Sequence, residues 1–83
     1  MFTIGIDPHK GSHLAAVLDE HARLLDELRV RADRNQRDRL LKFAAPYVPR
    51  VWAVEGARGL GALVAQQLVA AGETVADVPP SGD

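Results

Sequence analysis

The chain has 83 residues, enough for one small domain, and carries a formal net charge of −1. This near-neutral balance gives no general attraction to nucleic acid, and the absence of cysteine excludes disulfides and thiolate metal sites. No apolar run reaches the roughly 18 residues of a membrane span and no signal peptide precedes the first apolar run, so we expect a cytoplasmic protein without a membrane partner.

The first half of the chain predicts two strands, one ambiguous segment and a helix, at residues 2–7, 13–19, 23–31 and 34–46. The two strands alternate in polarity and are joined by a short loop with Pro and Gly, as in a hairpin. The third segment suits a strand with Leu24, Leu28 and Val30 facing inward, or a helix, which its residue propensities favour. Asp33 is the expected cap of the helix, and the apolar stripe consists of Leu40, Leu41 and Ala44.

The second half predicts a strand, a helix and a final strand, at residues 50–55, 59–71 and 73–78. Gly72 stands where the helix should stop. The apolar stripe expected for this helix is interrupted by Gln67 and otherwise consists of Leu60, Leu63, Val64, Leu68 and Ala71. Residues 81–83 look like a ragged tail.

Two of the predicted strands end in a carboxylate, Asp7 in the first and Glu55 in the fourth. Either acid alone is more often a turn residue than a catalytic one. In an open α/β sheet, however, ligands bind beyond the carboxyl ends of the strands, and adjacent parallel strands would bring the two acids together there. Such a pair shares a proton or binds a cation, and oxygen ligands favour Mg²⁺ or Mn²⁺, two of which can act on a phosphodiester.

Three segments resemble the DEDD transposases of bacterial insertion sequences, the insertion sequence 110 family. They are Ile4-Gly5-Ile6-Asp7-Pro8-His9-Lys10, Trp52-Ala53-Val54-Glu55-Gly56 and Asp77-Val78-Pro79-Pro80. The resemblance covers residues 2–80 and implies a RuvC-like domain of the ribonuclease-H fold, in the α/β class. We therefore expect a mixed five-stranded sheet in the order 3-2-1-4-5 with two helices, residues 23–31 as its third strand, and residues 1–83 as the N-terminal part of an incomplete domain.

The same resemblance implies DNA transposition by metal-dependent strand cleavage and transfer. Asp7 and Glu55 match the first two acids of the family's tetrad, so they are the expected catalytic and metal-binding residues, with Mg²⁺ or Mn²⁺ only weakly bound. The family's other two acids and its C-terminal serine domain have no match in this sequence, so we expect these residues alone to be inactive. The implied partners are DNA, a structured guide RNA and further copies of the full-length protein.

Residues 29–42 hold five Arg and one Lys against two Asp, which makes a nucleic-acid surface possible. Lys10 lies near the first acid and could neutralise a phosphate. The opposing interpretation is a solvated helix face with Asp33–Arg37 and Asp38–Lys42 pairs. The candidate nucleic-acid contacts are Lys10, Arg34, Arg37 and Lys42.

Two further interpretations belong to other classes of protein. The glycines at Gly56, Gly59 and Gly61 could form the phosphate turn of a dinucleotide-binding module over residues 50–78, with Asp77 as its ribose-binding acid. Their spacing differs from the usual fingerprint, and Glu55 would repel the pyrophosphate. The remaining interpretation is an inactive folded relic that serves only as an interaction module.

Overall fold

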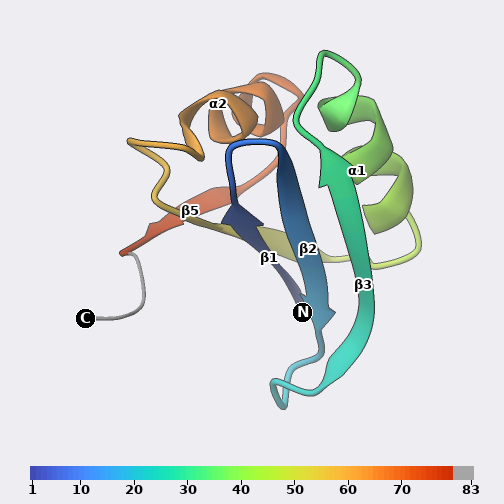
Figure 1. The fold of residues 1–83 in the computed structure, drawn as a ribbon. Helices are drawn as coiled ribbons and strands as arrows, with labels where there is room; N and C mark the ends of the chain where they lie inside the picture. Colours follow the sequence, from blue (N-terminus) through green and yellow to red (C-terminus); the bar gives the residue numbers. More distant parts are fainter. Residues whose placement is uncertain (80–83) are drawn as a thin grey trace.

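The computed structural model describes residues 1–79 and contains five strands and two helices (Figure 1). The expected tail at 81–83 lies outside the described residues. No helix in the described part of the chain is long and apolar enough to cross a membrane. The elements in chain order are β1 Phe2–Pro8, β2 Ser12–Leu18, β3 Leu24–Arg31, α1 Gln36–Ala44, β4 Arg50–Glu55, α2 Ala62–Ala70 and β5 Val75–Val78.

The strands form one mixed sheet in the order β3-β2-β1-β4-β5, which confirms the expected topology. β2 is antiparallel to β1 and β3, whereas β4 is parallel to β1 and β5. Residues 24–31 form a strand despite their helical propensity. They pair with β2 along most of its length, for example Val30 with His13 and Leu28 with Ala15, so tertiary pairing outweighs the local preference.

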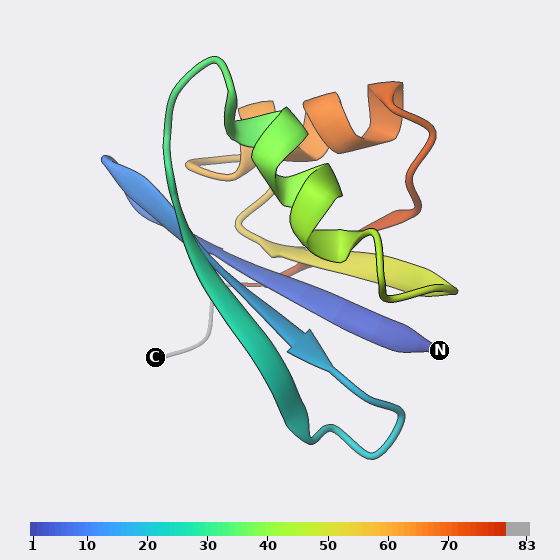
Figure 2. The ribbon, with the colours of Figure 1, turned by 90° about the vertical axis from the view of Figure 1, so that its right-hand side faces the viewer.

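Both helices lie on the same side of the sheet (Figure 2). The core lies between the helices and the sheet. Ile4 and Ile6, which share one face of β1 by its alternating polarity, are both buried there. Within residues 1–79 no helix covers the opposite face, whose centre carries the small residues Gly5, Ala16 and Ala53 side by side. The rest of the core consists of Ala15, Val17, Val30, Leu40, Ala44, Trp52, Val54, Val64, Ala65 and Leu68.

The expected apolar stripe of the second helix is wrong at both ends. Leu60 and Leu63 are 59% and 60% exposed, and the exposed Ala71 follows the helix. The cause is Gly61, where an added Cβ would lie 2.7 Å from Cγ1 of Val54, closer than real Cβ contacts come. Gly61 therefore faces β4, and the residues that share its face become the buried ones: Val64, Ala65 and Leu68.

The expected start and ion pairs of the first helix are also wrong. The helix begins at Gln36, and Asp33 does not cap it: Oδ1 of Asp33 accepts the backbone N–H of Asn35 at 2.9 Å, just before the helix. The carboxylate of Asp33 pairs with Arg39 at 3.1 Å rather than with Arg37, which pairs instead with Asp38 at 3.2 Å. A further misplaced side chain is Leu24, expected inward but 55% exposed at the start of β3.

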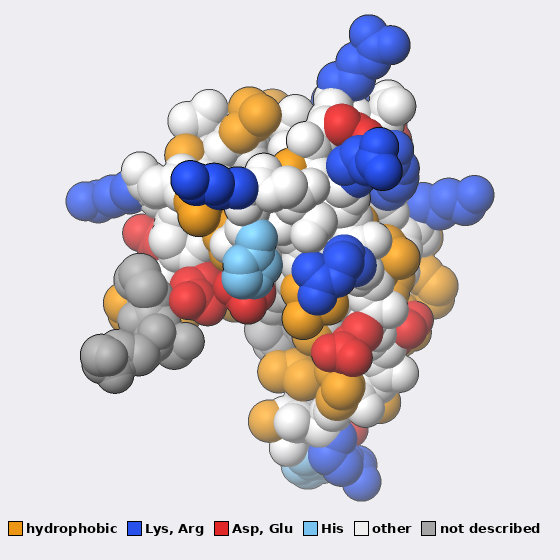
Figure 3. All heavy atoms as spheres, in the orientation of Figure 1, with side chains coloured by type: hydrophobic (Ala, Val, Ile, Leu, Met, Phe, Trp, Pro, Cys, Tyr) orange, Lys and Arg blue, Asp and Glu red, His pale blue; other side chains and the backbone are white. Residues whose placement is uncertain are grey.

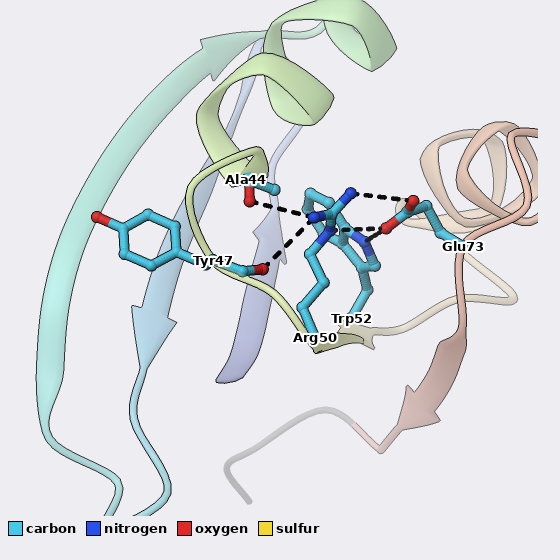
Figure 4. A network of polar contacts seen from close by, with 5 residues as sticks. All are labelled: Ala44, Tyr47, Arg50, Trp52 and Glu73. Atoms are coloured by element: carbon cyan, nitrogen blue, oxygen red, sulfur yellow. Dashed lines mark hydrogen bonds and ion pairs between the residues drawn. The ribbon is translucent and has the colours of Figure 1, made fainter. Parts of the chain in front are cut away.

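A partly buried polar network fixes the start of β4 (Figure 4). Arg50 donates to both carboxylate oxygens of Glu73, at 2.9 and 3.1 Å, and the indole N–H of Trp52 donates to the same carboxylate at 2.6 Å. Nη1 of Arg50 also donates to the backbone carbonyl oxygens of Ala44 and Tyr47, at 3.3 and 3.4 Å. The network therefore joins β4 to the end of α1 and to the segment before β5.

Candidate metal-binding and nucleic-acid site

Asp7 and Glu55 lie next to each other at the carboxyl ends of two adjacent parallel strands. The register pairs Gly5 with Ala53 and Ile6 with Val54, so the next residue on each strand is one of the two acids. Side chains alternate along a strand, which places both acids on the face of the sheet away from the helices. We call these two residues the acid pair.

The acid pair lines two hollows at this edge of the sheet. One, of about 290 Å³, opens over the small residues of the helix-free face, with Leu14 and Val78 at its sides. The other, of about 230 Å³, continues over Pro8 and Gly56 to Leu60. The Asp7 side chain is 51% exposed, so solvent and ligands can reach the pair from outside.

An imidazole lies beside the acid pair. Nε2 of His9 is 3.3 Å from Oδ2 of Asp7, and both side chains are about half exposed. The His9 backbone is held in the β1–β2 loop, where its N–H donates to the carbonyl oxygen of Ser12 at 2.9 Å. On the face drawn in Figure 3, acidic side chains gather next to a histidine, with a basic side chain beyond it.

The chain turns sharply directly after Glu55, at Gly56. Gly56 has a φ of +65°, which favours glycine, and its N–H donates to the carbonyl oxygen of Val78 at 3.1 Å. Oδ1 of Asp77 accepts the N–H of Ala57 at 3.2 Å. Asp77 thus holds this turn, which argues against the ribose-binding role that the dinucleotide interpretation required of it.

Two of the four candidate nucleic-acid contacts line the same hollow. Lys10 and Arg34 line a shared third hollow next to the acid pair. Arg37 forms an ion pair with Asp38 and does not line that hollow. Lys42 lies in the last turn of α1 and is also outside it. The structure therefore brings two of the four together.

Sequence reasoning missed a buried hydrogen-bonded chain at the base of the third hollow. Nε2 of the buried His13 lies 3.0 Å from Oε1 of Gln36, whose Nε2 donates to Oε1 of Gln67 at 2.8 Å. These residues link β2, α1 and α2. The available signals were the interruption of the second helix's apolar stripe by Gln67 and the place of His13 on the same strand face as Ala15 and Val17.

The acid pair fits part of a site for a hard divalent cation. Carboxylate oxygens are the ligands that Mg²⁺ prefers, and Mg²⁺ readily keeps several waters beside one or two carboxylates. Residues 1–79 contain no group of three or more His, Asp or Glu side chains arranged to hold a metal ion. The pair is therefore a two-ligand donor set that water or further groups would have to complete.

The sheet order and the two helices define a RuvC-like domain of the ribonuclease-H fold. RuvC of T. thermophilus, solved in complex with a Holliday junction substrate, superimposes with a TM-score of 0.70 and 22% sequence identity over 95% of this chain. The chain spans 65% of the length of that RuvC chain. The transposase family of DEDD enzymes of the insertion sequence 110 type matches residues 4–81, and the chain belongs to this family. No curated protein matches it.

Proposed function

We propose that this chain is the N-terminal part of a transposase catalytic domain that cleaves and transfers DNA strands with the help of divalent metal. The observation that carries the proposal is the acid pair, two carboxylates side by side at the strand ends where ligands bind in α/β sheets. Membership of the transposase family supports DNA transposition as the process. DNA as substrate is supported by the fold shared with RuvC, which was solved with a Holliday junction.

Asp7 and Glu55 would hold Mg²⁺ or Mn²⁺, which when bound polarises a phosphodiester oxygen as a Lewis acid. The carboxylates bring two negative charges to an edge that solvent reaches, so they balance the charge of the cation. His9 touches Oδ2 of Asp7 and so fixes the orientation of that carboxylate, as groups behind a metal ligand commonly do. With only two protein ligands, we expect affinity of about millimolar or weaker.

The remaining partners follow from the family rather than from this site. We propose that the full-length transposase works with a structured guide RNA, assembles as a homo-oligomer and acts on DNA in the cytoplasm. We also propose that residues 1–83 alone do not cleave DNA, because two carboxylates supply fewer ligands than a two-metal site needs.

Thermal unfolding in a magnesium titration tests the metal site. When Mg²⁺ exceeds its dissociation constant about fourfold, binding stabilises the fold by about 1 kcal/mol, which raises Tm by about 4–8 °C. We expect this rise for the wild type and for Asp38→Asn, a matched change at an exposed acid on α1. Asp7→Asn should remove it. KCl at equal ionic strength is the control for screening, and a rise that persists in Asp7→Asn contradicts the proposal.

A further inference from the structure

The third hollow, which we call the basic pocket, adjoins the acid pair. It has a volume of about 460 Å³ and forms where the β1–β2 loop, the β3–α1 connection and the start of α2 meet. Leu60 lines the basic pocket and also the 230 Å³ hollow of the acid pair. A ligand that passes over Leu60 can therefore occupy both. The other residues used below are His13, Lys10, Arg34, Leu63 and Gln67.

The basic pocket has an excess of positive charge. Neither Lys10 nor Arg34 forms an ion pair with any acid in residues 1–79. Asp33 also lines the pocket, but Arg39 holds its carboxylate. The hydrogen bond from Arg39, with help from the N–H of Asn35, keeps the pKa of Asp33 below its usual value. The two remaining cations favour an anion, and phosphate is the anion that a DNA-processing domain meets.

One wall of the basic pocket is apolar. Leu60 and Leu63 are 59% and 60% exposed, although both belong to the stripe that sequence patterning assigned to the core. A single exposed leucine needs no explanation, but two on the wall of a pocket with a charged rim offer a surface for a flat apolar group. A nucleobase is such a group, and it is attached to a phosphate.

The base of the pocket has unused hydrogen-bonding capacity. Because Nε2 of Gln36 donates to Gln67, Oε1 of Gln36 accepts from Nε2–H of His13, and in the neutral imidazole Nδ1 of His13 is then an acceptor. That buried nitrogen has no partner in the described part of the chain. The amide nitrogen of Gln67, a partly exposed residue, also donates to no residue among 1–79. A buried polar atom without a partner, such as Nδ1 of His13, is uncommon in a folded protein, and a functional role is one of the explanations for it.

We propose that the basic pocket binds one unpaired nucleotide of a nucleic-acid strand whose adjoining phosphate lies at the acid pair. The base would pack on Leu60 and Leu63 and meet the amide of Gln67, while Lys10 and Arg34 bind its phosphates. The inference rests on the proposed function, because that function supplies the strand. It adds that the strand is single at this point, since a paired and stacked base cannot enter the pocket.

Fluorescence anisotropy with a labelled 12-nucleotide oligothymidylate tests the pocket, in chelator so that metal binding plays no part. Leu63→Gln should weaken binding about fivefold, the value of one apolar contact returned to water. Val69→Gln is the matched control, because Val69 is on the same helix and 59% exposed, and it should change binding little. The plot of log K against log salt has a negative slope, and Lys10→Gln and Arg34→Gln should each make it less steep by about 0.7. Arg37→Gln should leave the slope unchanged, because Arg37 is paired with Asp38.

Three further probes make the result decisive. An oligomer with abasic sites keeps the phosphates but loses every contact of the base, so it should bind to the wild type at least as weakly as the intact oligomer binds to Leu63→Gln. A duplex should bind more weakly than the single strand, and an RNA oligomer shows whether the pocket prefers ribose, either sugar being compatible with it. Equal effects of Leu63→Gln and Val69→Gln, equal affinity for duplex, or no binding to any of these probes overturns the inference.

Failure of this inference is distinguishable from failure of the proposed function. Asp7→Asn removes the magnesium response, and in chelator it should bind the oligomer at least as tightly as the wild type, because it removes a negative charge beside the proposed phosphate. A wild type that responds to magnesium while Leu63→Gln, Lys10→Gln and Arg34→Gln bind like the wild type refutes the pocket and leaves the metal site standing. The opposite pattern refutes the metal site alone.

Discussion

Glu73→Gln should destabilise the protein more than any change at an exposed ion pair. The side chains of Arg50 and Glu73 are only 17% and 16% exposed, and Trp52, which also donates to Glu73, is fully buried. The amide keeps the size of the carboxylate but has one acceptor oxygen where the network uses two, and no charge to balance the guanidinium. The substitution therefore weakens the main polar contact between the start of β4 and the segment before β5. β4 is the strand that carries Glu55.

The structure sets the magnitude of this effect. Removing one partner of a fully buried ion pair costs about 3–5 kcal/mol. The pair here is partly exposed, and Arg50 retains two backbone carbonyls as acceptors, so we expect a loss of about 2 kcal/mol, or about 8–16 °C in Tm. Asp38→Asn is the control. This substitution breaks the ion pair between Asp38 and Arg37, whose respective side chains are 70% and 48% exposed. It should lower the free energy of unfolding by less than about 0.5 kcal/mol.

The loss should depend on pH. Burial raises the pKa of Glu73, but the hydrogen bonds from Arg50 and Trp52 outweigh burial, and the pKa lies below its usual value of 4.5. A depressed carboxyl pKa stabilises the fold above the usual pKa, and this stability disappears as the pH falls through the lowered value. Urea denaturation at several pH values measures the difference between wild type and Glu73→Gln. That difference should be constant at neutral pH and shrink below about pH 4.5. A difference under about 0.5 kcal/mol at pH 7, or one unchanged down to pH 3, refutes this account of the network.

Two other predictions concern the site. Gly61→Ala should lower Tm, because the added Cβ would lie 2.7 Å from Cγ1 of Val54 and 2.9 Å from the carbonyl oxygen of Glu55; differential scanning calorimetry measures this, and a Tm equal to that of the wild type contradicts the close packing. In plasmid nicking assays with Mg²⁺ or Mn²⁺, the 83-residue chain should show no cleavage above background, and nicking that is lost in Asp7→Asn would show that the acid pair is sufficient.

The sheet could be predicted because its signals are local or come from the family. The alternating polarity of β1 identifies its buried face. Asp7 and Glu55 each end a strand, so adjacent parallel strands are enough to predict that the two acids lie together. Residues 24–31 show the limit of local signals, because their helical propensity gives way to pairing with β2. Only the family resemblance favoured the strand.

The helix faces and the basic pocket could not be predicted because they depend on contacts between distant segments. The orientation of α2 follows from the close approach of Gly61 to Val54, which no periodicity of apolar residues encodes. Asp33 pairs with a residue six positions away because α1 starts later than the cap pattern indicates. Lys10 and Arg34 come from two different loops and meet only after β2 and β3 have paired.

Paramagnetic broadening by Mn²⁺ tests the central claim that the acid pair is the metal site of this transposase domain. In a ¹H–¹⁵N NMR titration, the account predicts that substoichiometric Mn²⁺ first broadens the amide signals of Asp7, Glu55 and their chain neighbours, and that excess Mg²⁺ restores them. In Asp7→Asn the same signals should stay sharp, while Asp38→Asn should behave as the wild type. Broadening that begins elsewhere, or that is unchanged in Asp7→Asn, would contradict the claim.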